Sequence, residues 1–286
     1  MRNRNGKTGY ELFYSDKTRN FLGHFGIFDG INDPIAEYDR AVKRIQESDQ
    51  RYITAKYGNN HSQPTLRCHL LEGQWVSEDI ETIYALADFG EMRASGMPAE
   101  GTFDLGIAIG AVNQAPKNRL DYIFSLMNTN AAHFRHIAIG GNPNRLIDDT
   151  IRKNAENYAP LANDEFDLCA NAARVAEKNN PGTGVTVYAI TGDKVCNNTV
   201  LSTICKKSLQ NGILRRSSWV LAVTTPIYYS TLLEDVKLVQ KELDIEIFVA
   251  GNTTAQSIID GRKVSHYYSE CLRWIWAMLN SAKAGL

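Results

Sequence analysis

The apolar runs of this chain are short, and their length restricts its fold more than any other feature. None approaches the roughly 20 residues that an apolar helix needs to cross a bilayer. Their β-branched and aromatic content is typical of buried strands. The runs that we interpret as strands are residues 10–14, 21–28, 103–112, 134–139, 185–190, 219–223 and 245–250.

Segments with helical periodicity separate these runs. Apolar residues recur on one face from Ser77 onward, over residues 163–178 and 232–243, and from about Ser265 to the end of the sequence. Residues 114–132 give no clear pattern and receive no assignment. The strands thus arrive in clusters rather than in strict alternation with helices, which favours an α+β fold of sheets covered by helices. No linker rich in Gly, Ser and Pro divides the sequence, so we expect a single domain over residues 1–286.

Charge and cysteine content exclude several classes of protein. The chain has 31 basic and 32 acidic residues, so no global field favours nucleic acid or an anionic membrane as a partner. The first residues include no apolar stretch of secretory length, and we expect a cytoplasmic protein. The five cysteines are scattered and form no CxxC pair, which fits buried free thiols better than disulfides or a zinc site.

One acidic corner carries a family resemblance. Residues 24–30 read HFGIFDG, an apolar run that ends at Asp29 and Gly30. This segment resembles the signature of the protein phosphatase 2C family, in which an F-G-V-F strand ends in Asp-Gly-His-Gly-Gly. Ordinary turn chemistry also places Asp-Gly after a strand.

Later segments resemble further family landmarks in the same order. Residues 101–103 followed by an apolar run resemble the Gly-Ser/Thr-Thr-Ala strand, and residues 136–147 resemble the strand and hairpin written A-N-x-G-D-S-R. Residues 219–229 resemble F-L-V-L-A-T-D-G-L-W-D, and residues 232–243 match the helix that follows it. The resemblance therefore implies two packed antiparallel sheets flanked by helices, a four-layer sandwich over the whole chain.

The resemblance also implies a metal site that this sequence has largely lost. The family holds two Mn²⁺ or Mg²⁺ ions with several carboxylates, because two close dications must be neutralised by hard anionic oxygens. Asp29 is present, Gly30 matches the backbone ligand, and Glu11 matches the first family acid. The matched positions that no longer bear the family's residue are Leu12, Ile31, Thr225 and, in one of two placements of the final Asp-Asn pair, Gly251.

Two acids where the family uses at least four leave room for one Mn²⁺ or Mg²⁺ ion at most, and we expect no resident cofactor. The first functional hypothesis is thus a pseudophosphatase that binds a protein partner without hydrolysis. A second hypothesis is an active metal-dependent serine/threonine phosphatase with replacement ligands such as Asp16, Asp148 or Asp149. A third is a subunit of a larger assembly with an unrelated α+β fold.

A pair of tryptophans is the main non-catalytic feature. Trp274 and Trp276 cannot easily share the inward face of one helix, so one of them is a candidate interface residue. Packing of both in the core is the alternative.

Overall fold

The computed structural model describes residues 7–28, 30–57, 75–93, 99–191, 197–252 and 264–286. The chain divides into two compact units, which are described separately below. Gly96–Thr225 and Val239–Thr253 form an α/β unit, and Arg2–Ser95, Pro226–Leu238 and Thr254–Leu286 form a helical unit. The single domain expected from the sequence stays a prediction.

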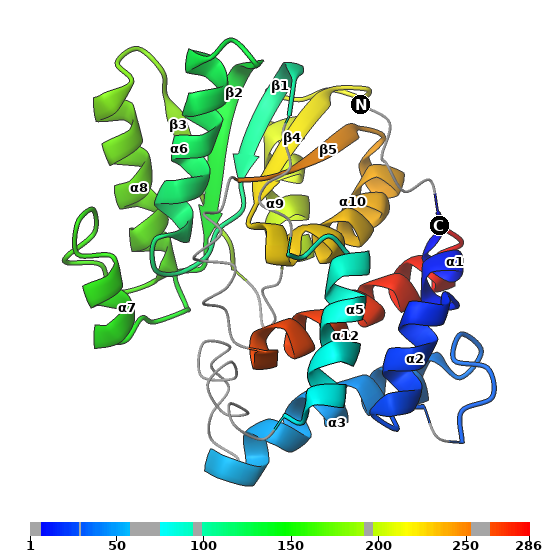
Figure 1. Cartoon of the computed structure of the whole chain (residues 1–286). Coiled ribbons are helices and arrows are strands. Elements are labelled where there is room, and N and C mark those ends of the chain that lie inside the picture. The colour runs from blue at the N-terminus through cyan, green and yellow to red at the C-terminus, as the bar shows by residue number, and fades with distance from the viewer. Residues whose placement is uncertain (1–6, 29, 58–74, 94–98, 192–196, 253–263) are drawn as a thin grey trace. The chain divides into compact units, whose positions relative to one another are not determined.

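The α/β unit contains five parallel strands in one sheet (Figure 1). The strands are β1 (Gly101–Ala108), β2 (Ala132–Gly141), β3 (Val185–Ala189), β4 (Trp219–Thr224) and β5 (Glu246–Gly251). Their order across the sheet is β3-β2-β1-β4-β5, so the chain winds outward from β1 in one direction and then returns to its other side with β4. This is the order of a doubly wound fold.

The expected pair of antiparallel sheets is therefore wrong. The main cause is the unassigned stretch 114–132, most of which forms α6 (Ala115–Asn128) with Pro116 in its first turn. Parallel neighbours need a crossover connection, usually a helix, and α6 provides it between β1 and β2. Without that helix, the two strands form a cluster in the sequence with no assigned element between them.

Helices enclose the sheet. α6 and α8 (Glu165–Asn179) pack over one apolar cluster with strand residues such as Ile137, Ile139 and Val223. α9 (Asn197–Gln210) packs against β2 and lies behind the strands in Figure 1. A short helix, α7 (Asp149–Asn154), precedes α8, and α10 (Tyr229–Leu243) leads from the helical unit back into the α/β unit before β5.

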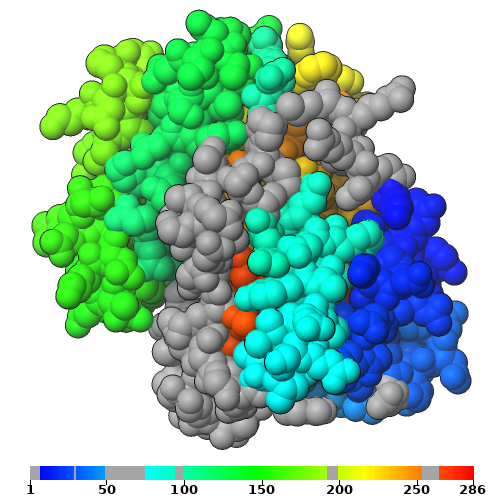
Figure 2. Space-filling model, in the orientation of Figure 1, coloured from blue at the N-terminus to red at the C-terminus, as the bar shows by residue number. Residues whose placement is uncertain are grey.

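The helical unit contains α1 (Gly9–Phe13), α2 (Asp16–His24), α3 (Tyr38–Tyr57), α5 (Ser77–Phe89) and α12 (Val264–Lys283), with a 3-10 turn at Pro226–Tyr228. α12 is its central element, because it contacts α1, α3 and α5 and most of its residues are buried. On the face drawn in Figure 2, α12 shows only small areas beside α5, while α5, α1 and α2 form most of the coloured surface of this unit. The amide of Gly9 donates to the carbonyl of Leu286 over 2.9 Å, which ties α1 to the last residue.

The strands expected at residues 10–14 and 21–28 are also wrong, because both stretches are mainly helical. Thr8 caps α1 by accepting from the Glu11 amide, and the Glu11 carboxylate accepts from the Thr8 amide, so the two residues form a capping box. Ser15 caps α2 in the same position. Short apolar runs fit a strand or a helix equally well by periodicity, and here the caps decide for helix.

Candidate functional site

The parallel sheet has one topological switch point, between β1 and β4. β1 and β4 are hydrogen-bonded neighbours, but the chain leaves β1 toward β2 on one side and leaves β4 toward β5 on the other. The loops after these two strands therefore part from each other. In doubly wound sheets, ligands bind in the crevice outside the carboxyl ends of the strands at this point.

Arg119 joins the two loops at the switch point. The residue lies in the second turn of α6, and only 1% of its surface is exposed. Its guanidinium donates to the carbonyls of Ile109 and Gly110 after β1, and to the hydroxyl of Thr225 after β4 over 3.2 Å. A hydrogen bond that involves a charged group contributes about 1.5–3 kcal/mol. Arg119 thus fixes the distance between the two loops.

A buried carboxylate lies beside this arginine. Glu165 is the first residue of α8, follows the N-cap Asp164, and is 4% exposed. Burial raises the pKa of the Glu165 carboxyl, while the nearby Arg145, the Asn142 amide and Arg119 act in the opposite direction. The Arg145 guanidinium lies 3.5 Å from a Glu165 carboxylate oxygen. Glu165 therefore links α8 to the loop after β2.

Three glycines let these elements approach closely. A Cβ on Gly110 would lie 1.8 Å from the carbonyl oxygen of Gly140, so β1 and β2 touch through their backbones at this point. A Cβ on Gly141 would lie 2.6 Å from the carbonyl oxygen of Glu165. The first turn of α8 consequently rests directly on the end of β2, which brings the Glu165 side chain to within 3.3 Å of the Cβ position of Gly110.

The loop between β1 and α6 is held from its other side as well. Gln114 donates to the carbonyl of Asn154 and, over 2.8 Å, to the side chain of Asn157. The Tyr158 hydroxyl donates to the carbonyl of Asn113, a residue with a φ of 58°. This loop is thus preorganised rather than free to move. We call Arg119, Arg145, Glu165 and Thr225 the carboxyl-edge cluster.

The residues that the phosphatase resemblance singled out are divided between the two units. Glu11, Leu12, Gly30 and Ile31 belong to the helical unit, and Thr225 and Gly251 belong to the α/β unit. Asp29 lies outside the described residues. Leu12 and Ile31 are buried in the apolar core of the helical unit, where they serve packing. Gly30 lies in an exposed turn with a φ of 75°.

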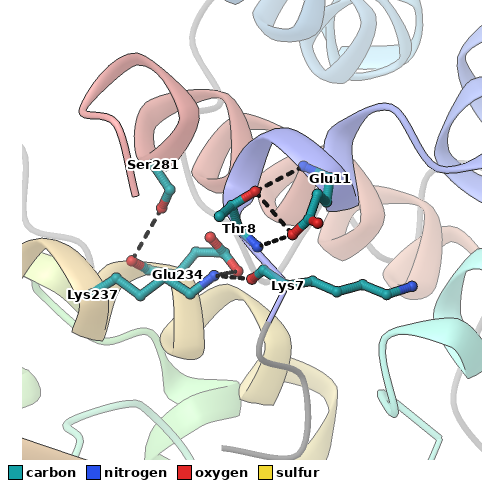
Figure 3. Close-up of polar contacts among 6 residues, drawn as sticks. All are labelled: Lys7, Thr8, Glu11, Glu234, Lys237 and Ser281. Carbon is teal, nitrogen blue, oxygen red and sulfur yellow. Dashed lines mark hydrogen bonds and ion pairs between the residues drawn. The ribbon is translucent and has the colours of Figure 1, made fainter.

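Glu11 has a structural role in the capping box. Figure 3 shows its carboxylate turned back toward the Thr8 amide, with Lys7, Glu234 and Lys237 nearby. The hydrogen bond from the Thr8 amide is the main cause that lowers the pKa of Glu11. The carboxylate is engaged at the start of α1.

Two of the three acids considered as replacement ligands have local partners. Asp148 caps α7 by accepting from the Ile151 amide over 2.7 Å, Asp149 pairs with Arg152, and Asp16 lies in the first turn of α2. Within the described ranges, no three His, Cys, Asp or Glu side chains gather as a metal would require. Cys169, Cys205 and Cys271 are buried and free.

The two tryptophans of the last helix differ in exposure. Trp274 is 2% exposed, packs against Phe89 with ring centroids 5.9 Å apart, and belongs to the core. Trp276 is 36% exposed. Of the two, only Trp276 remains a candidate interface residue.

Sequence reasoning missed Arg119, Arg145 and Glu165. A signal for Arg119 was present, because Leu120, Ile123 and Phe124 recur at helical spacing after Pro116 and place Arg119 on the same apolar face. An arginine that is buried on such a face must have partners, because charged side chains are almost never fully buried unless they are paired. The pairing of Arg145 with Glu165 had no sequence signal, since it depends on the packing of α8 on β2.

No family model matches the chain, and searches of the curated proteins and of the solved structures gave no significant match. The phosphatase resemblance thus stays a prediction, although the fold that it implied is wrong. Along the described parts of the chain, no helix has both the length and the apolar character required to cross a membrane.

Proposed function

We propose that the α/β unit binds a small organic ligand at the carboxyl ends of β1 and β4. The observation that carries this proposal is the β3-β2-β1-β4-β5 order together with Arg119, which joins the two loops at the switch point. The argument from strand order is an analogy with other doubly wound sheets. The buried Arg119 adds a reason specific to this chain. Burial of a guanidinium has a desolvation cost, and its hydrogen bonds to the two loops must offset that cost.

The proposal concerns binding and not turnover. Around this edge, the described side chains offer hydroxyl, amide and guanidinium groups and the buried Glu165 carboxylate, and these groups suit hydrogen bonding to a ligand. The thiol of Cys169 is fully buried there, and burial raises its pKa far above the ordinary value, so it is a poor nucleophile. A ligand-binding module is the function that these groups support best.

The regulatory, protein-binding role predicted from the sequence stays a proposal beside this one. The partly exposed Trp276 supports it, since tryptophan is enriched among residues that dominate the energy of protein interfaces. The cytoplasmic location and the absence of hydrolysis likewise stay predictions.

The test is a binding screen followed by one isosteric substitution. Nucleosides, nucleotides and small carboxylic acids would be screened by thermal shift, and hits measured by titration calorimetry. Thr225→Val keeps the side-chain shape but removes the hydroxyl that accepts from Arg119. We expect a loss of affinity of about 10-fold or more, because without this bond the loops after β1 and β4 are no longer held at the spacing that the ligand requires.

Thr102→Val is the matched control, because Thr102 is an exposed residue near the amino end of β1, away from the proposed crevice. Equal affinity in this control and in the wild type is the expected result. The binding site of each hit is mapped from its backbone amide shifts by NMR. The proposal is overturned by shifts that lie at the amino ends of the strands, or by a screen without any hit.

A further inference from the structure

The loop after β2 presents one arginine in a fixed position. The amide of Arg145 donates to the carbonyl of Asn142 over 3.2 Å, and its carbonyl accepts from the Glu165 amide over 3.0 Å. The Asn142 side chain accepts from the Asn144 amide over 2.8 Å, which stabilises the turn before it. The backbone at Arg145 is therefore held on both sides, and its side chain starts from a defined point.

The guanidinium of Arg145 is held on one side only. Its side chain is 33% exposed, whereas its partner Glu165 is almost fully buried. Among the described residues, Glu165 is the one side chain that pairs with it. A guanidinium has five N–H donors in a planar fork, so the pair with Glu165 engages only some of the donors of this partly exposed side chain.

The pair of Arg145 with Glu165 orients the guanidinium and is not an ordinary surface ion pair. Surface ion pairs join two flexible, solvated side chains and contribute little. Here the carboxylate is buried at the first turn of α8, where the close contact between Gly141 and Glu165 fixes it against β2. An arginine that is anchored by a buried carboxylate keeps its free donors in one direction, which favours bidentate contact with an oxyanion.

The position also suits the ligand site. β2 is the direct neighbour of β1, and adjacent strands lie roughly 5 Å apart. The end of β2 is thus about 10 Å from the end of β4, within the length of a small organic ligand that enters the switch point.

We infer that Arg145 recognises an oxyanion, either a phosphate or a carboxylate, on the ligand of the α/β unit, with Glu165 as its positioning residue. The inference rests on the proposed function and names the chemical class of its ligand. The free donors of Arg145 bind the oxyanion, and Glu165 holds the guanidinium in the orientation that this requires.

The experiment titrates the full-length chain with inorganic phosphate and, separately, with succinate, and follows backbone amides and the arginine Nε–H signals by NMR. We expect the amides of residues 141–145 and the Nε–H of Arg145 to shift. Shifts with phosphate alone assign a phosphate ligand, and shifts with succinate alone assign a carboxylate. The matched control is Arg135→Gln, because Arg135 also belongs to this stretch of chain, on β2, and also pairs with a carboxylate, Asp104, over 2.9 Å.

Arg145→Gln should weaken binding of the oxyanion by at least 10-fold, whereas Arg135→Gln should leave it unchanged. Glu165→Gln should weaken binding several-fold and broaden the Nε–H signal of Arg145, a change that a purely structural role would not cause. No shift with either anion, or equal affinity in wild type and Arg145→Gln, would overturn the inference. If an organic ligand loses affinity in Thr225→Val but not in Arg145→Gln, the proposed site stands and the role of Arg145 falls.

Discussion

The two units bury charged side chains in different ways. In the helical unit, two buried carboxylates pair with a cation three residues later on the same helix, Glu234 with Lys237 on α10 and Glu270 with Arg273 on α12. In the α/β unit, Arg119 and Glu165 instead contact loops outside their own helices, and Arg119 joins the loop after β1 to Thr225 after β4. An ion pair within one helix neutralises the buried charge but does not connect that helix to another element. Contacts between loops shape the carboxyl edge of the sheet, and this difference is why we place the ligand site there.

The cores of the units differ in the same sense. The helical unit packs aromatic rings, with Phe21, Phe25, Trp75 and Tyr268 in mutual contact at centroid distances of 4.9 to 6.2 Å. The centre of the sheet is mainly aliphatic and needs glycine where strands and helices meet. In the helical unit, large aromatic side chains fill the space between helices. In the α/β unit, the strand ends pack through direct backbone contact, which leaves no room for a side chain.

The largest expected effect tests that dependence. Gly110→Ala places a Cβ 1.8 Å from the Gly140 carbonyl oxygen, so β1 and β2 must separate. We expect a loss of about 3 kcal/mol or more in the free energy of unfolding, at or above the upper end of ordinary overpacking. Urea denaturation followed by circular dichroism gives the value.

Gly184→Ala is its control, because a Cβ there meets no atom within 4 Å. A stability close to that of the wild type is expected for this control. If Gly110→Ala proves as stable as Gly184→Ala, the close backbone contact is not a requirement of the fold.

An intermediate effect is expected in the helical unit. Lys237→Met leaves the Glu234 carboxylate, which is 2% exposed, without the ammonium that lies 2.6 Å from it. Removing one partner of a buried ion pair lowers the free energy of unfolding by about 3 kcal/mol. We expect a smaller loss here, because the Lys237 side chain is partly exposed. Figure 3 shows that the same ammonium also reaches the carbonyl of Lys7.

The double variant Glu234→Leu/Lys237→Met removes both charges and should recover most of the lost stability, because apolar replacements of a buried pair are often neutral. Ligand binding at the carboxyl edge should stay unchanged in both variants. A change in ligand affinity here would contradict the separation of roles between the units.

The smallest expected effect is the pH dependence of stability that one carboxylate from each unit causes. Burial raises the pKa of Glu165 above its ordinary 4.5, so the unfolded chain releases this proton first as pH rises. The stability of wild type relative to Glu165→Gln should therefore fall as pH rises above 4.5, and level off beyond the folded-state pKa.

Glu11 should show the opposite sign. Its pKa is lowered by the Thr8 hydrogen bonds, so wild type gains stability relative to Glu11→Gln above 4.5 and loses it as pH falls through the folded-state pKa. Urea denaturation at several pH values from about 3 to about 8 gives the free energy of unfolding of wild type and variants. This range takes a carboxyl from mostly protonated to fully ionised. Slopes of equal sign would show that one carboxylate has been placed in the wrong environment.

Much of the local structure was predictable from the sequence. The helix expected from Ser77 is α5, the one expected over residues 163–178 is α8, and the final helix is α12. The runs interpreted as strands from residue 103 onward are all strands of the sheet. Long periodic segments carry their own signal, because one face must be buried whatever covers it.

The errors arose where local patterns were ambiguous. Residues 10–14 and 21–28 are short apolar runs, and Thr8 and Ser15 turn them into capped helices. With two false strands before residue 30 and one helix missing between β1 and β2, the alternation of strands and helices is hidden, and the antiparallel sheets follow from the phosphatase resemblance alone. The resemblance then reads Leu12 and Ile31 as positions that have lost metal ligands, whereas both are core residues of the helical unit.

The sequence by itself determined where most helices and the later strands lie, because hydrophobic periodicity and capping act over a few residues. Only the tertiary structure decided that the strands run parallel in the order β3-β2-β1-β4-β5, and that Arg119, Arg145, Glu165 and Thr225 meet at one edge. These residues are far apart along the chain, and their contacts depend on crossover helices and on backbones that touch at glycines. No local pattern encodes such a meeting, since it exists only after the sheet has assembled.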